Sequence, residues 1–151
     1  MKFSYFERQQ ALNTNITQAW DFISNPKNLN KITPKSLNFK IISNPPEKIY
    51  SGLMIEYKIG IIPGFSHRWL TKITDVEERK SFIDAQKVGP YKIWSHKHSL
   101  KETTNGVLMR DQIYYMLPLQ PFSLIISSIN KKRLKTIFDY RKKKLNEIFS
   151  T

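Results

Sequence analysis

Hydrophobic and polar side chains alternate along most of the chain, with a repeat of two residues. The alternation runs through residues 2–12 and returns six times between residues 37 and 117. Successive side chains of a strand point to opposite faces, so this repeat is typical of β-strands. Apolar residues share one face and lysine or arginine the other, which predicts an antiparallel sheet with one covered face. The later segments are residues 37–43, 53–61, 65–76, 80–88, 92–100 and 107–117.

The segment after the first strand follows a helical repeat of 3.6 residues instead. In residues 16–23 the apolar side chains fall on one side of a helix. Asn15 can cap the start of this helix, and Pro26 ends it. Residues 27–32 then add a short second helical turn. We therefore expect two short helices between the first and second strands.

The helical repeat returns after Pro121 and continues to the end of the chain, which predicts a long terminal helix. Its apolar side rotates by about a third of a turn after Ile129, so we expect a kink or break near residues 127–130. This helix is the only element large enough to cover the apolar face of about seven strands. The prediction is an α+β fold in a single domain, residues 1–151, with a ligand cavity between sheet and helix.

Turn residues predict which strands are neighbours. Short gaps fall at residues 63–64, 77–79, 89–90 and 104–106. A hairpin at Asn105-Gly106 pairs residues whose numbers add to about 209, and one at Gly89-Pro90 pairs residues adding to about 180. In this register His98 lies opposite Asp111, and His96 lies opposite both Asp84 and Ile113. Each histidine then has a carboxylate across a strand, on the face where an unpaired charge would be costly.

Three interpretations of this polar group compete. In the favoured one, two His–Asp pairs satisfy each other inside a partly apolar cavity. In the second, the same groups form the polar end of a ligand pocket. In the third, they are an acid–base pair or a metal site, because two histidines spaced as in His96-Lys97-His98 project from one face of a strand. Since the acids explain the histidines without an ion, we expect no metal and no cofactor.

Several longer motifs resemble those of a known superfamily. They are "AWDFISNPKNL" from Ala19, "WLTKI" from Trp69, "GPYKIWSHKH" from Gly89, "MRDQIYYMLP" from Met109 and "IFDYR" from Ile137. Together they resemble the helix-grip superfamily (SRPBCC), which includes START lipid-transfer domains, birch-pollen-allergen-like proteins and polyketide cyclases. The resemblance spans nearly the whole chain and is nearest to small bacterial stand-alone domains. It implies a curved antiparallel sheet around a long C-terminal helix, on a scaffold that carries binders, carriers and a few enzymes.

From the pattern and the resemblance we expect a protein that binds or carries a small, largely apolar ligand. The predicted ligand-binding residues are Phe39, Ile41, Ile55, Tyr57, Trp69, Phe82, Asp84, Trp94, His96, His98, Asp111, Ile113, Tyr115 and Arg141. Arg141 interrupts the apolar stripe of the terminal helix. It either snorkels past the sheet edge or gives the cavity a cationic end. One alternative is a cyclase- or dehydratase-type enzyme that uses a His–Asp pair as general base. We predict no catalytic residues beyond that alternative.

Composition excludes several other classes. The chain has no cysteine, so disulfides and thiolate chemistry are absent. It has no nucleophile-elbow motif, no phosphate-binding glycine loop and no His-Glu-x-x-His motif. There is no apolar run long enough for a signal or a membrane span, and we expect a cytoplasmic protein.

The formal net charge is +13, from 25 lysines and arginines against 12 acidic residues. Residues 130–151 hold eight basic residues and two acids, so nearly half of the excess lies in one segment. A charge run of this kind usually marks a solvated helix face. A further alternative is a partner-binding module that docks through this helix. We expect at most weak contact with an anionic membrane surface and no specific nucleic-acid partner.

Overall fold

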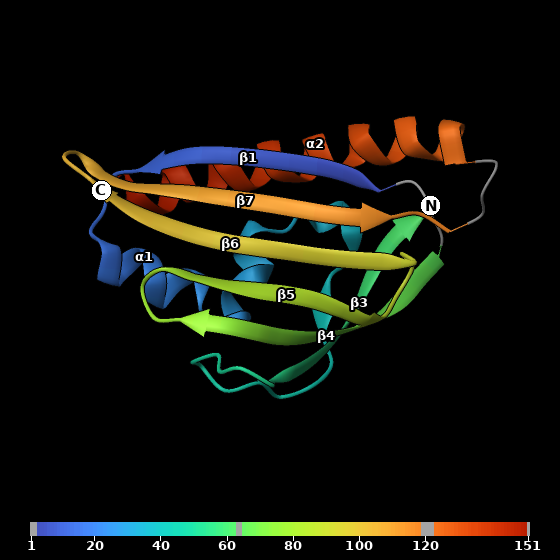
Figure 1. The fold of residues 1–151 in the computed structure, drawn as a ribbon, viewed down its shortest axis with the longest axis horizontal. Helices are drawn as coiled ribbons and strands as arrows, with labels where there is room; N and C mark the ends of the chain where they lie inside the picture. Colours follow the sequence, from blue (N-terminus) through green and yellow to red (C-terminus); the bar gives the residue numbers. More distant parts are fainter. Residues whose placement is uncertain (1–2, 63–64, 119–122, 151) are drawn as a thin grey trace.

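The computed structural model describes residues 3–62, 65–118 and 123–150. The predicted turn at residues 63–64 and Pro121 at the start of the last helix lie outside these residues. Seven strands and four helical segments form an α+β fold (Figure 1). The strands are β1 (Ser4–Leu12), β2 (Lys40–Ile41), β3 (Met54–Ile62), β4 (Phe65–Glu77), β5 (Ser81–Val88), β6 (Ile93–Thr103) and β7 (Gly106–Met116). The helices are α1 (Ile16–Ile23), the 3₁₀ segments η1 (Pro26–Ile32) and η2 (Lys35–Leu37), and α2 (Ser123–Phe149).

All seven strands belong to one antiparallel sheet, in the order β1-β7-β6-β5-β4-β3-β2. Both predicted registers are confirmed. In the β6–β7 hairpin His98 lies opposite Asp111, and between β5 and β6 His96 lies opposite Asp84. At the hairpin turn Gly106 has φ +132°, and a Cβ there would lie 2.2 Å from the Leu12 carbonyl oxygen. A glycine is therefore needed where the turn passes the end of β1.

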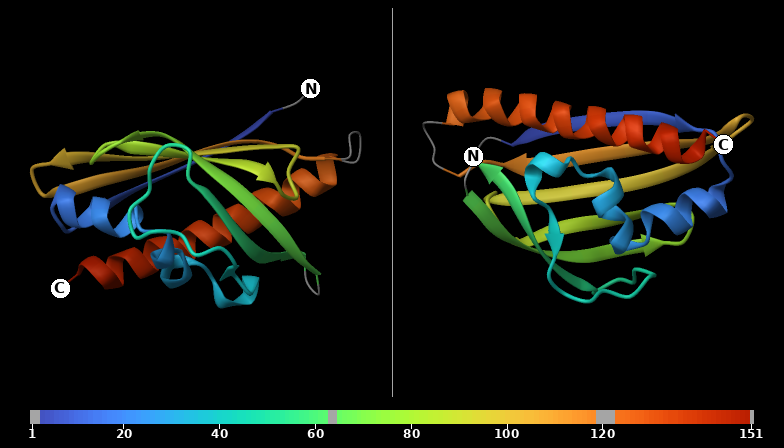
Figure 2. Two further views of the ribbon diagram at one scale, coloured as in Figure 1. Left: turned by 90° about the horizontal axis from the view of Figure 1, so that it is seen from below. Right: turned by 180° about the vertical axis from the view of Figure 1, so that it is seen from behind.

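The helices lie together on one side of the sheet. Figure 2 shows the sheet curving over α2, with α1 and the two 3₁₀ segments beside that helix. Asn15 caps α1 as predicted, because its side chain accepts a hydrogen bond from the Gln18 amide. The core lies between the two layers. Its most fully buried large side chains include Leu12, Met109, Ile113, Tyr115 and Leu145.

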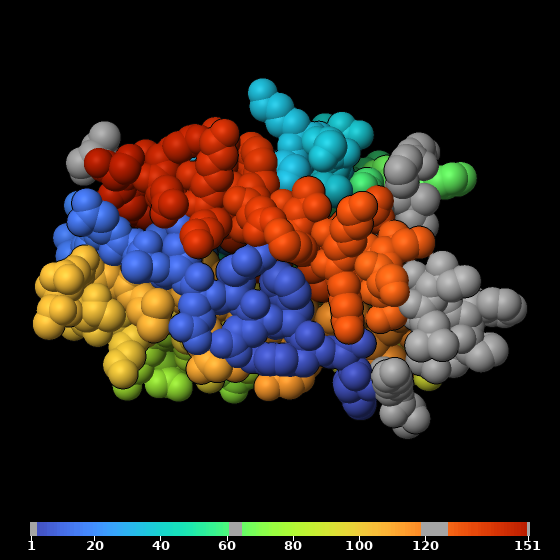
Figure 3. All heavy atoms as spheres, turned by 90° about the horizontal axis from the view of Figure 1, so that it is seen from above, coloured from blue at the N-terminus to red at the C-terminus, as the bar shows by residue number. Residues whose placement is uncertain are grey.

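The outer face of α2 lies open beside β1 along one side of the molecule (Figure 3). Exposed lysines cover this face, as the charge pattern predicted, and several are paired with acids. Lys135 contacts Asp139 at 2.6 Å, and Lys144 contacts Glu147 at 2.6 Å. No helix in the described part of the chain has the length and apolar character to cross a membrane.

Two sequence predictions about element boundaries are wrong. The segment expected as a strand over residues 37–43 forms only the two-residue β2, because η2 occupies the residues before it. The predicted break near residues 127–130 is absent, since α2 is one unbroken helix. The stripe with Leu134, Phe138 and Leu145 is buried, while Ile129 is 60 % exposed. The helix therefore buries the stripe with Leu134, Phe138 and Leu145, and Ile129 points to solvent.

Candidate functional site

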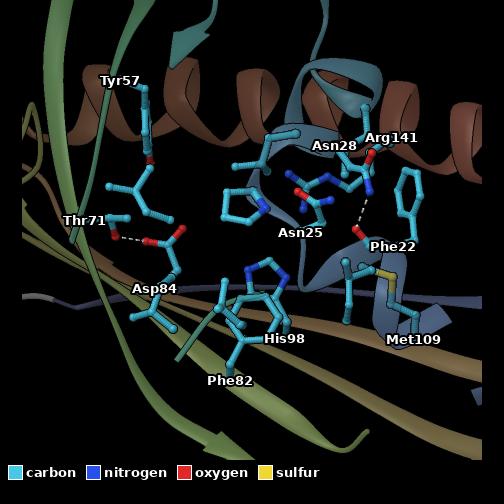
Figure 4. Close-up of a pocket in the computed structure, with 17 residues that line it drawn as sticks. Phe22, Asn25, Asn28, Tyr57, Thr71, Phe82, Asp84, His98, Met109 and Arg141 are labelled. Atoms are coloured by element: carbon cyan, nitrogen blue, oxygen red, sulfur yellow. Dashed lines mark hydrogen bonds between the residues drawn. The ribbon is translucent and has the colours of Figure 1, made fainter. Parts of the chain in front are cut away.

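The interior between the sheet and the helices contains two adjacent cavities. The larger has a volume of about 110 Å³ and the smaller about 40 Å³. Five residues line both, so only a partition of side chains separates the two spaces. These are Leu29, Tyr57, Asp84, His98 and Arg141. In Figure 4 Asp84 and His98 project from the sheet side of the smaller cavity, and Arg141 reaches it from α2.

Aromatic rings form one wall of the larger cavity. Tyr57 stacks on Trp69 with ring centroids 5.8 Å apart, and Trp69 meets Trp94 edge-on at 5.2 Å. Tyr91 packs against Trp94 at 4.7 Å. Tyr57, Trp69 and Trp94 come from β3, β4 and β6 and point to the same face of the sheet, and Tyr91 joins them from the turn before β6. Leu134, Ile137 and Phe138 of α2 form part of the opposite wall.

The cavity also lies close to the molecular surface. A groove of about 520 Å³ runs between α2 and the η2 region. The groove and the larger cavity share Leu37, Arg133 and Ile137. A single layer of side chains therefore separates the groove from the interior.

Both inward-facing histidines contact the same carboxylate. His96 Nε2 lies 2.7 Å from Asp111 Oδ1, and His98 Nδ1 lies 3.1 Å from the same oxygen. The two imidazole rings lie against each other at an angle of 30°, with centroids 3.7 Å apart. When each ring donates its N–H to Asp111, the other ring nitrogen is left as an acceptor. Asp111 therefore fixes the orientation and the tautomer of both rings.

This arrangement corrects part of the predicted pairing. Asp84 lies opposite His96 in the sheet, but the hydrogen bond of His96 goes to Asp111. The Asp84 carboxylate instead accepts a hydrogen bond from the Thr71 hydroxyl. The histidines thus share one aspartate rather than having one each, and Asp84 faces both cavities.

Burial is the largest single influence on the pKa values of His96, Asp84 and Asp111. It lowers the pKa of His96 to about 3, helped by the neighbouring His98 and opposed by Asp111. Burial also raises the pKa of Asp84, although the Thr71 hydrogen bond opposes this. For Asp111 burial would raise the pKa, but the hydrogen bonds from His96 and His98 outweigh it and hold the pKa well below its usual range. Near neutral pH His96 is therefore neutral and Asp111 is ionised.

Three of these residues also offer a potential metal site. Ligand atoms of Asp84, His96 and His98 lie within 4.8 Å of one another. A nearby positive charge opposes a cation there. The Arg141 guanidinium lies 3.6 Å from Asp111, the aspartate that both histidines contact. Its positive charge, which also lowers the pKa of His96, would repel a metal ion.

We expect the protein to contain no stoichiometric metal after mild purification, because the network places a fixed cation beside these ligands. Elemental analysis of the purified protein checks this. About one zinc, iron or nickel ion per chain, lost in His96→Ala but retained in His67→Ala, would contradict the prediction.

Most of the predicted ligand-binding residues line a cavity, and some do not. Phe39, Trp69, Trp94 and His96 line the larger cavity; Ile55 and Phe82 line the smaller; Tyr57, Asp84, His98 and Arg141 line both. The other four lie elsewhere: Asp111 behind the histidines, Ile113 and Tyr115 fully buried in the core, and Ile41 half-buried on β2. The alternation of the strands predicts which side chains face inward, but not which of these line a cavity and which are packed in the core.

Other wall residues were missed in the sequence. Tyr91 belongs to the turn before β6, where its main chain bonds to Gln86, and no repeat marks it. Thr71 lines the smaller cavity from β4. Leu134, Ile137 and Phe138 carried a usable signal, because they belong to the apolar stripe of the terminal helix.

Comparison with solved structures identifies this architecture. Protein CV1439 from Chromobacterium violaceum aligns over 98 % of this chain and 99 % of its own, with TM-score 0.75 and 9 % identity. Ara h 8.0201 aligns over 97 % and 99 %, with TM-score 0.63 and 15 % identity. The chain has the helix-grip fold. Ginseng major latex-like protein 151 from Panax ginseng shares it over 97 % of both chains, with TM-score 0.67 and 12 % identity.

The predicted helix-grip architecture is therefore confirmed. These identities are low, so the similarity concerns the fold. No family model and no curated protein matches the sequence. What this helix-grip protein binds must be argued from its own cavity.

Proposed function

We propose that this protein binds a small, largely apolar molecule in the cavities between the sheet and α2. The observation that carries the proposal is an aromatic and aliphatic interior with a few polar side chains gathered where the two cavities meet. Ligand sites commonly combine an apolar lining with a small number of orienting polar groups. Together the cavities offer about 150 Å³. An apolar cavity of about that volume holds one benzene ring, so the ligand is compact.

The histidine network supports a second candidate, a reaction on the bound molecule. Asp111 holds both imidazoles with one nitrogen each directed away from it, and His96 is neutral near pH 7 because burial lowers its pKa to about 3. An oriented imidazole facing a cavity can act as a general base on an enolisable ligand. The lowered pKa of His96 makes that ring a weak base, so the candidate base is His98, which lines both cavities. Binding is needed in either case, so we place it first.

Indole, a compact neutral bicycle somewhat larger than benzene, is the probe for binding. We expect it to bind saturably with a Kd below about 1 mM. Very tight binding is not expected, because a ligand with few heavy atoms can gain only limited binding free energy. Replacing Ile137 with Trp should abolish binding, because this side chain stands between the groove and the larger cavity. Titration followed by the amide signals of labelled protein gives the Kd.

The matched control is Ile129→Trp. Ile129 lines the outer groove but not the cavity, so this variant should bind indole within about twofold of wild type. Failure of wild type to bind, or equal loss of binding in both variants, would contradict an interior site.

A further inference from the structure

Arg141 is a buried cation on the inner face of α2. It is 8 % exposed and lies among apolar residues of that helix. An arginine stays charged inside a protein, so burial has to be compensated by hydrogen bonds or by opposite charge. The guanidinium carbon Cζ lies 4.7 Å from the centroid of the Phe138 ring, a cation–π contact. This contact uses none of the N–H donors of the group.

Two of those donors are unused. Nε and Nη1 are buried and have no hydrogen-bond partner among the residues that the structure describes. Asp111 is the nearest anion, but Nη1 lies 3.6 Å from its Oδ1, which is too long for a hydrogen bond. That oxygen is already occupied by His96 and His98. Arg141 therefore has charge compensation nearby but no acceptor for these two donors.

The position of Arg141 matches that of a ligand-recognition group. It lines both cavities, at the partition where they meet. Asp84 also lines both; its carboxylate accepts a hydrogen bond from the Thr71 hydroxyl, and burial raises its pKa.

The outer groove beside the larger cavity is also positively charged. Lys132 and Arg133 line the outer groove, and Arg133 also lines the larger cavity. With a net charge of +13, the protein attracts anions to this groove over a distance of about one Debye length.

We propose that the ligand carries a carboxylate, and that Arg141 binds it through the unused Nη1 group at the junction of the cavities. This inference rests on the proposed function and specifies the class of ligand: a compact apolar acid. A carboxylate suits this donor because hydrogen bonds between charged partners are the stronger class. The apolar part of the ligand would occupy the aromatic cavity lined by Trp69 and Trp94.

The test compares indole-2-carboxylate with indole-2-carboxamide, which has nearly the same shape without the charge. At pH 7.5 wild type should bind the acid at least about tenfold more tightly than the amide. Arg141→Met should remove this preference by weakening the acid alone. Lys142→Met is the matched control. It removes an exposed charge from the adjacent position of α2 and should keep the preference within about twofold.

The outcomes separate the two proposals. Equal affinity of wild type for acid and amide would overturn the carboxylate site and leave the apolar site standing, and so would a preference that survives Arg141→Met. Binding of neither compound would overturn the proposed function itself. Unchanged amide binding by Arg141→Met shows that the variant is folded. Should it not fold, the wild-type comparison alone decides the outcome.

Discussion

Asp111→Asn is expected to lower the free energy of unfolding by about 3 kcal/mol, the usual cost of removing one partner from a buried charged group. Asp111 is 4 % exposed and compensates three neighbours at once. His96 and His98 both contact its Oδ1, and Arg141 lies 3.6 Å away. The asparagine keeps the shape but removes the anion nearest to the Arg141 guanidinium. Urea unfolding of the two proteins measures the difference.

Two further variants show that the loss comes from the network. Asp139→Asn is the control, because Asp139 is an exposed acid that pairs with Arg8 and Lys135 on the surface; its loss should be much smaller. Adding Arg141→Met to Asp111→Asn should recover part of the stability, since the uncompensated cation is then gone. An Asp111→Asn protein as stable as wild type would contradict the structural role. If it bound ligand normally, a catalytic assay would follow, with turnover expected to fall by about a hundredfold or more.

Stability should also fall as the pH is lowered from 7.5 to 5. The pKa of His96 is about 3 in the folded protein and about 6.5 in the unfolded chain. Below pH 6.5 the unfolded state therefore binds the extra proton, and each pH unit costs about 1.4 kcal/mol. At pH 5 this amounts to roughly 2 kcal/mol. Asp84 acts in the opposite direction, because its raised pKa lets the folded state take up a proton first, so the net loss is smaller.

Urea unfolding at pH 7.5 and pH 5.0 tests this dependence. His96→Gln should have a lower free energy of unfolding than wild type at both pH values. Its free energy of unfolding should change less between pH 7.5 and pH 5.0, because the contribution of this ring is gone. His67→Gln, which removes the third histidine and leaves the network intact, should keep the wild-type slope. A wild-type slope unchanged in His96→Gln would show that this ring does not carry the pH dependence.

The sheet was predictable from the sequence because turns and alternation fix its register. The β6–β7 hairpin placed His98 opposite Asp111, and the β5–β6 turn placed His96 opposite Asp84, as expected. Register fixes the backbone but not the side-chain torsions. The Asp111 carboxylate contacts both histidines, and the Asp84 carboxylate accepts a hydrogen bond from the Thr71 hydroxyl. Contacts that depend on these rotations could not be predicted from a pairing rule.

The helical layer was less predictable. Helical spacing located α2 and its inward stripe, but it did not show which of the two stripes would be buried. That choice depends on the sheet, which leaves Ile129 exposed and buries Leu134 and Phe138. Arg141 stood out in the sequence as a charge inside an apolar stripe. Its unused donors and its place between two cavities depend on the packing of β5, β6 and α2 together.

The measurement that tests the interior site most directly is an isotope-filtered nuclear Overhauser spectrum of methyl-labelled protein saturated with indole. We expect contacts from the indole protons to the methyl groups of Ile59, Leu134 and Ile137, which line the larger cavity. Contacts confined to Ile129 on the outer groove, or no contacts to any cavity methyl group, would contradict it.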